Sequence, residues 1–216
     1  MVNIGIIAEG DTDFVTLQNI LIGYFDRDVT GYINQLQPKR GQMGGWSRVL
    51  NYCETTNFKK DFVDNDFMII QVDTDRSFEL PFDVSHEENG VKISVEQLIE
   101  NVKERFQKLF ETAFGADFFQ NYAHRILFAI TVHETECWLL PLHYSKEKEA
   151  ESIRNCYETL NKKVKGLQKT YKIYDALSDD FTAPKKLEKA SQANPSFKIF
   201  VENELKIKIP QITEGV

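Results

Sequence analysis

Three short apolar runs, separated by stretches with helical periodicity, constrain the fold of this chain most strongly. The runs span residues 3–8, 67–72 and 125–132, and their length and richness in β-branched residues are typical of buried strands. A weaker strand is predicted over Val29–Leu36. Strands that alternate with long connections form a mainly parallel sheet covered by helices on both faces. We therefore expect an α/β, Rossmann-like fold.

Apolar residues at three- and four-residue spacing predict the helices between these strands. The first helix takes Thr12 or Asp13 as its N-cap. A second runs from Trp46 to Cys53, and a long third opens at the capping box Ser94–Gln97.

A length of 216 residues fits one domain with an appendage. We predict an α/β domain over residues 1–143 and a helical C-terminal extension over residues 144–216, packed on the same core. In the extension, Pro184 and Pro195 suit the first turns of two short helices, the second of them capped by Asn194.

The charge of the chain is acidic and unevenly distributed. With 26 basic and 33 acidic residues the net charge is −7, which argues against a protein that coats nucleic acid by bulk electrostatics. Residues 161–200 have a net charge of +5, and residues 1–160 one of −11. The lysines of the basic segment form either a solvated helix face, which we favour, or a strip that contacts nucleic acid together with Tyr171 and Tyr174.

The cysteines and the hydropathy pattern indicate the compartment. Cys53, Cys137 and Cys156 are far apart in sequence and include no Cys-x-x-Cys pair, so we expect them to be reduced and buried, without a disulfide framework or a zinc site. No apolar run approaches the ~20 residues that span a bilayer. We expect a cytoplasmic protein with no membrane partner.

Acidic residues follow three of the predicted strands directly. The set consists of Glu9 and Asp13 after the first strand, Asp73 and Asp75 after the third, and His133, Glu134 and Glu136 after the fourth. Carboxyl ends of parallel strands meet at one edge of a sheet, where ligands bind. Crowded carboxylates require protons or a counter-cation, and oxygen-only ligands suit Mg²⁺ or Mn²⁺. The sequence therefore predicts a metal site at this edge.

Simpler interpretations exist for each part of this set. The segment Glu9–Asp13 alone is typical of a capped turn, and Asp73–Asp75 alone of a solvated loop; only their joint occurrence favours a metal. Glu134 and Glu136 could serve only the dipole of a helix that starts there. His133 could act in catalysis as a proton shuttle, ligate the metal, or hydrogen-bond a neighbouring carboxylate, the role that we favour.

The loop Pro38–Gly45 precedes a helix and is a candidate phosphate site. Lys39 and Arg40 supply positive charge, and Gly44 and Gly45 could present backbone N–H groups. The glycine spacing is not that of a Walker loop, and a surface turn is the commoner explanation.

The turn Glu9–Asp13 and the Asp-x-Asp after the third strand resemble the Toprim family, whose members use Mg²⁺ for phosphodiester chemistry. The resemblance implies that Glu9 is the general acid/base or first metal ligand. It implies that Asp73 and Asp75 bind metal, and it matches Asp13 to an acidic residue of nuclease-type members.

A closer resemblance involves the segment Val132–Leu140, which is similar to the His-Glu-x-Glu-Ala-Leu-Leu signature of an uncharacterised bacterial Toprim-like family. Ala183–Leu187 is similar to a segment near the end of that family, which makes Lys185 or Lys186 candidates for a catalytic lysine and for phosphate binding. Cys137-Trp138 departs from the signature. The overcoming-lysogenization-defect nucleases of phage defence are more distant relatives by this resemblance.

Three functions remain open on the sequence. The first is a metal-dependent nuclease, with nucleic acid as substrate and two-ion chemistry. The second is a Toprim module that is inactive alone and works beside an ATPase partner. The third and most distant is a haloacid-dehalogenase-type phosphatase, in which Asp73 would attack phosphorus; there the motif normally lies on the first strand, whereas here two strands precede it.

Overall fold

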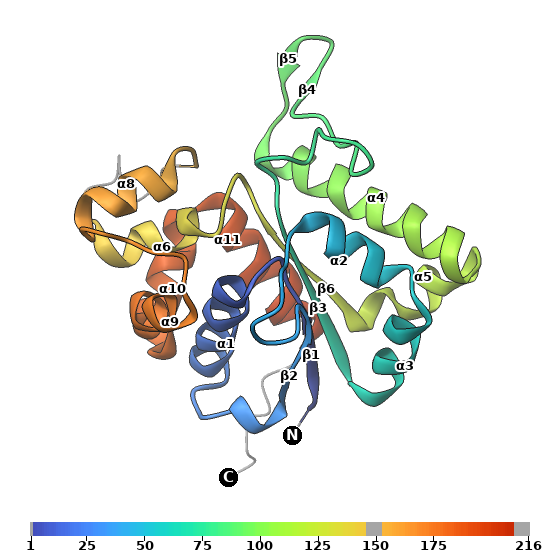
Figure 1. The fold of residues 1–216 in the computed structure, drawn as a ribbon, viewed down its shortest axis with the longest axis horizontal. Coiled ribbons are helices and arrows are strands. Elements are labelled where there is room, and N and C mark those ends of the chain that lie inside the picture. Colours follow the sequence, from blue (N-terminus) through green and yellow to red (C-terminus); the bar gives the residue numbers. More distant parts are fainter. Residues whose placement is uncertain (1, 146–152, 210–216) are drawn as a thin grey trace.

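A four-stranded, all-parallel sheet forms the centre of the molecule (Figure 1). The structure, a computed structural model, describes residues 2–145 and 153–209. In spatial order the strands are β2 (Ile33–Gln37), β1 (Ile4–Ile7), β3 (Phe67–Asp73) and β6 (Ile126–Thr131). The predicted α/β fold with a mainly parallel sheet is confirmed.

Helices cover both faces of the sheet because side chains alternate along each buried strand. Ile4 and Ile6 face one layer and Ile7 the other. The first layer contains α1 (Asp11–Phe25), α6 (Glu136–His143), α8 (Cys156–Lys163), α9 (Tyr171–Ser178), η3 (Asp179–Thr182), α10 (Pro184–Ala193), α11 (Pro195–Ile199), the π-helix η4 (Phe200–Leu205) and α12 (Lys206–Lys208). The second contains α2 (Trp46–Cys53), α3 (Thr56–Asp64), α4 (Val95–Phe114) and α5 (Asp117–Tyr122).

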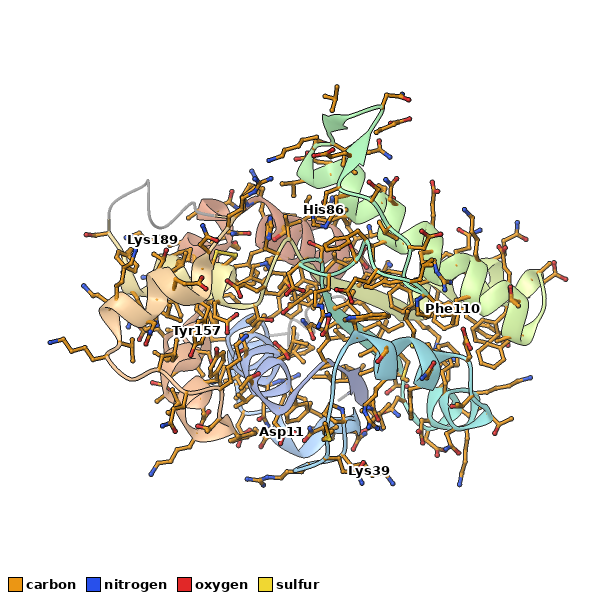
Figure 2. The ribbon with its side chains drawn as sticks, turned by 45° about the horizontal axis from the view of Figure 1, so that its top comes forward. Asp11, Lys39, His86, Phe110, Tyr157 and Lys189 are labelled. Atoms are coloured by element: carbon orange, nitrogen blue, oxygen red, sulfur yellow. A yellow bond between two sulfur atoms is a disulfide. The ribbon has the colours of Figure 1, made fainter. Side chains whose placement is uncertain are left out.

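Phe110 lies in the second layer, whereas Tyr157 of α8 lies at the far side of the first (Figure 2). Short 3₁₀ turns, η1 (Thr30–Tyr32) and η2 (Ala123–Arg125), lead into β2 and β6. A hairpin of β4 (Glu87–Glu88) and β5 (Val91–Lys92) projects beyond the carboxyl ends of the strands (Figure 1).

The helices after α6 complete the core beside α1 and cover the edge strand β6. The Glu204 carboxylate accepts a hydrogen bond from Phe128 N at 3.1 Å, and Lys208 Nζ donates to Ile126 O at 2.7 Å. These side chains satisfy backbone groups that β6 would otherwise leave unpaired. Buried Glu204 is balanced by Lys208 at 2.7 Å and Lys103 at 2.9 Å. No helix in the described parts of the chain is both long and apolar enough to span a bilayer.

Two of the predicted helix caps are confirmed and one is wrong. Ser94 Oγ accepts from Gln97 N, and Asn194 caps α11. The N-cap of α1, however, is Gly10 and has no side-chain cap bond. Thr12 and Asp13 both lie inside α1, which begins at Asp11, and the Asp13 carboxylate is used in a tertiary contact described below.

The expectation of three reduced cysteines is also wrong. Cys137 and Cys156 form a disulfide, while Cys53 is free and buried. The two bonded residues are separated by 19 positions, but the packing of α8 on α6 brings their Cα atoms to 5.0 Å. Sequence spacing alone could not show this contact. Helices α3, α5 and α9 and the β4–β5 hairpin are further elements that the sequence analysis did not predict.

Candidate metal centre

Five carboxylates from four segments gather at the carboxyl edge of the sheet. We call them the acidic cluster: Glu9 after β1, Asp13 in the first turn of α1, Asp73 at the end of β3, Asp75 two residues later, and Glu136 at the start of α6. Each carboxylate influences others electrostatically, so they share one local field. This convergence follows from parallel strands that all end at the same edge.

Asp73 lies at the centre of the cluster. Its Oδ1 accepts hydrogen bonds from Gln71 Nε2 at 2.9 Å and from the Thr131 hydroxyl. The Thr135 hydroxyl lies 3.2 Å from Asp73 Oδ1 and 2.6 Å from Asp13 Oδ1, so it bridges the two carboxylates. Thr131 is the register partner of Asp73 across β3 and β6, so the pairing of the two strands fixes the hydrogen bond between their side chains.

The side chain and the backbone of Glu9 are both held by hydrogen bonds with β3 and with the loop before α2. Asp73 N donates to Glu9 Oε1 at 2.7 Å, and Glu9 N donates to Gln71 Oε1 at 3.0 Å. Gly45 N donates to Glu9 O at 2.7 Å. A Cβ added to Gly44 would overlap that same carbonyl, so only glycine allows the loop before α2 to lie this close to Glu9.

The predicted phosphate loop therefore reaches the cluster through its glycines. Gly41 N donates to Asp11 Oδ2 at 3.0 Å, and Lys39 lies on the same side of the molecule as Asp11 (Figure 2). Lys39 and Arg40 are both exposed, and the Arg40 guanidinium lies 4.9 Å from the Tyr171 ring centroid. The loop thus lies next to the cluster with two basic side chains on its outer side.

Glu136 is the most deeply buried member, with 1% of its surface exposed. Its Oε1 pairs with Lys169 Nζ at 2.9 Å and accepts the hydroxyl of Tyr174. Its Oε2 is buried and has no hydrogen-bond partner among the described residues. A buried carboxylate oxygen that no protein group satisfies is available to a cation or to a water molecule.

The electrostatics of the cluster indicate an excess of negative charge. Burial, and then the Asp13 charge, raise the pKa of Glu9 to about 8. Burial raises the pKa of Asp13 to about 6, although the Thr135 hydrogen bond opposes the shift. Burial and the charges of Asp13 and Glu9 raise the pKa of Asp73 well above its usual range. Protons therefore neutralise part of the cluster near neutral pH when no cation does so.

His133 and Glu134 lie beside the cluster but have other contacts. The His133 ring packs edge-on to His86 at 5.8 Å, and burial together with the charges of Arg154, His86 and Lys92 lowers its pKa to about 4. The structure therefore places His133 among positive groups, where we expected a carboxylate partner. A φ of 69° at this residue turns the chain from β6 toward α6.

Glu134 Oε1 accepts from Tyr157 N at 2.7 Å in the first turn of α8. This contact directs the carboxylate toward α8, where it serves the helix N-terminus rather than Asp73. Of the two glutamates of this segment, Glu134 thus contacts α8, whereas Glu136 contacts Lys169 and Tyr174 and affects Asp13 and Asp73 through its charge.

Lys185 and Lys186 are not brought to the cluster. Lys186 pairs with Asp180 in η3, and η3 packs on α1 at Gly23, where an added Cβ would overlap Phe181 O. Gly23 is ten residues beyond Asp13, about 15 Å along the helix. Lys186 is therefore paired in a segment that packs by the C-terminal half of α1, away from Asp13.

The sequence did not assign several groups of the site to the acidic cluster. They are Gln71, Thr131, Thr135, Lys169 and Tyr174. Gln71 has a signal in the sequence, because residues 71 and 73 share one face of a strand. Lys169 has none, because it comes from the loop before α9 and its role depends on how α8 and α9 pack on α6 and α1.

The carboxylate oxygens of the cluster are ligands that suit a hard divalent cation. The side chains as they stand do not enclose one. Within residues 2–145 and 153–209, no three or more His, Cys, Asp or Glu side chains already stand in a metal-binding arrangement. Threonine hydroxyls engage Asp13 and Asp73, and Lys169 engages Glu136. The carboxylate-only set and the orphaned Glu136 oxygen suit Mg²⁺ or Mn²⁺ better than a soft metal.

Comparison of the chain with models of protein families, with curated proteins and with solved structures gave no match.

Proposed function

We propose that this protein is a metal-dependent phosphodiesterase of the Toprim type, with nucleic acid as substrate and Mg²⁺ or Mn²⁺ as cofactor. The observation that carries the proposal is the convergence of Glu9, Asp13, Asp73 and Glu136 at one sheet edge, with the buried Oε2 of Glu136 lacking a partner. The resemblance of the same segments to Toprim nucleases supports the class of chemistry and suggests a place in phage defence.

In this proposal Asp73 and Asp75 hold the ion, together with Glu9 and the free oxygen of Glu136. The bound ion would supply Lewis-acid stabilisation of the phosphoryl group. Burial and the Asp13 charge raise the pKa of Glu9 to about 8 when no ion is bound. A bound cation would lower that pKa, so Glu9 would be ionised in the loaded site, as a ligand or as a base. Its carboxylate is oriented for this by the N–H of Asp73 at 2.7 Å. Thr135 keeps Asp13 and Asp73 on the same side of the site.

Mn²⁺ titration calorimetry of wild type and Asp73→Asn tests the metal site, and cleavage assays on circular single-stranded DNA, plasmid and RNA test the activity. We expect wild type to bind Mn²⁺ and to cleave at least one of these substrates, and Asp73→Asn to lose both. Asp64→Asn, an exposed carboxylate at the end of α3, is the matched control and should retain both. Wild type without Mn²⁺ binding or metal-stimulated cleavage would refute the proposal.

The charge distribution supports a second candidate, in which the same site works only beside an ATPase partner. The net charge of −11 over residues 1–160 repels polyphosphate outside the immediate metal site, so a partner could supply the nucleic-acid affinity. Cleavage that appears only when such an ATPase is added would favour this form. Strong cleavage by the purified chain would exclude it.

A further inference from the structure

We infer that Lys169 takes the place of a second metal ion in the acidic cluster, so that the cluster binds one divalent cation per chain. The inference rests on the proposed function and concerns how many ions that site holds. It begins from the ion pair between Lys169 Nζ and Glu136 Oε1 at 2.9 Å.

The position of the ammonium group is defined by contacts on both sides. The Lys169 side chain, half exposed, crosses the Tyr157 ring at 5.2 Å from its centroid and ends at Glu136. There it interacts with the charges of Asp73 and Asp13 as well. Lys169 thus offsets the negative charge of Glu136, Asp73 and Asp13. The Glu9 carboxylate instead accepts hydrogen bonds from the backbone N–H groups of Asp73 and Trp46.

The two carboxylate oxygens of Glu136 have different surroundings. Oε1 is taken by Lys169 and by the Tyr174 hydroxyl. Oε2, in a side chain that is 1% exposed, has no partner among the described residues and is the oxygen left for an ion. At this carboxylate the ammonium takes one oxygen and the other is left as a ligand for a divalent cation.

A second divalent ion is disfavoured on the Lys169 side for two reasons. Ions of a two-metal site lie about 3.5–4 Å apart and share ligands. An ammonium that pairs with Glu136 Oε1 removes one of those ligands and repels a dication at that spacing, because both are positively charged and the Glu136 side chain that they would share is 1% exposed. The lysine therefore acts as a fixed monovalent cation where a two-metal enzyme has its second ion.

The experiment counts Mn²⁺ ions in the full-length chain without reference to activity. Calorimetry gives the number bound, and electron paramagnetic resonance separates an isolated Mn²⁺ from two spin-coupled ions. The variants are Lys169→Met, which keeps the length of the side chain but removes its charge, and Lys169→Arg, which keeps the charge. Circular dichroism melts verify that each variant is folded.

We expect one uncoupled Mn²⁺ in wild type and in Lys169→Arg, and two coupled ions in Lys169→Met. Two coupled ions in wild type, or a single ion in a folded Lys169→Met, would overturn the inference and leave the proposed metal-dependent function standing. Wild type that binds no Mn²⁺ would overturn both. These outcomes distinguish an incorrect number of ions from an incorrect proposed function.

Discussion

The raised pKa of Glu9 predicts that the candidate metal centre destabilises the metal-free protein as pH rises. Glu9 titrates near its ordinary 4.5 when unfolded and at about 8 when folded, because burial and the Asp13 charge disfavour its ionised form. Its contribution to stability is therefore present in full below pH 4.5 and is lost as pH rises toward 8. The interval from 4.5 to neutrality, at ~1.4 kcal/mol per unit, corresponds to about 3 kcal/mol.

Glu9→Gln removes this titration and keeps the shape of the side chain. We expect Glu9→Gln to gain up to ~3 kcal/mol in free energy of unfolding over wild type when pH is raised from about 4 to about 7 without metal. Urea denaturation in EDTA at a series of pH values measures the gain. Glu88→Gln on the exposed β4–β5 hairpin should show no such gain.

The reasoning is refuted if the stability of wild type and that of Glu9→Gln vary in parallel with pH. A gain that grows below pH 4.5 instead of above it would also contradict the direction of the shift. Saturating Mg²⁺ should reduce the difference, because the ion stabilises wild type by binding its ionised cluster.

Three further perturbations test other parts of the structure. Glu204→Gln leaves two lysines near a neutral group and should destabilise by about 3 kcal/mol, measured by urea denaturation. Combined Cys137→Ser and Cys156→Ser opens a loop of 19 residues and should lower stability by ~3 kcal/mol; equal melts of oxidised wild type and this variant would contradict the cross-link. Gly44→Ala should displace the loop from Glu9 and weaken Mn²⁺ binding in calorimetry, whereas unchanged binding would dissociate this loop from the site.

Strands β1, β3 and β6 were predictable because each is a short, buried apolar run that is followed by polar residues. Residues 67–72 predict β3 almost to its ends, and the expected position of Asp73 follows from that strand and from the parallel topology. The capping box at Ser94 likewise predicts the start of α4. These signals are local, so no knowledge of packing is needed to interpret them.

The weaker predictions concern residues whose environment is set by distant segments. His133 follows a strand as expected, yet burial and the charges of distant residues, Arg154 first among them, lower its pKa. Lys186 lies in a motif-like segment, but the packing of η3 on α1 carries it to the other end of the helix. The sequence identifies such groups, but it does not show which residues surround them.

The sequence by itself determined the parallel α/β fold and the edge at which Glu9 and Asp73 meet, because side-chain alternation and strand length are properties of contiguous residues. Only the tertiary structure decided that Cys137 is bonded to Cys156, and that Lys169 rather than Lys186 reaches the carboxylates. Those contacts join residues 19 or more positions apart, and which of many such pairs forms depends on how α8 and α9 dock on α6 and α1.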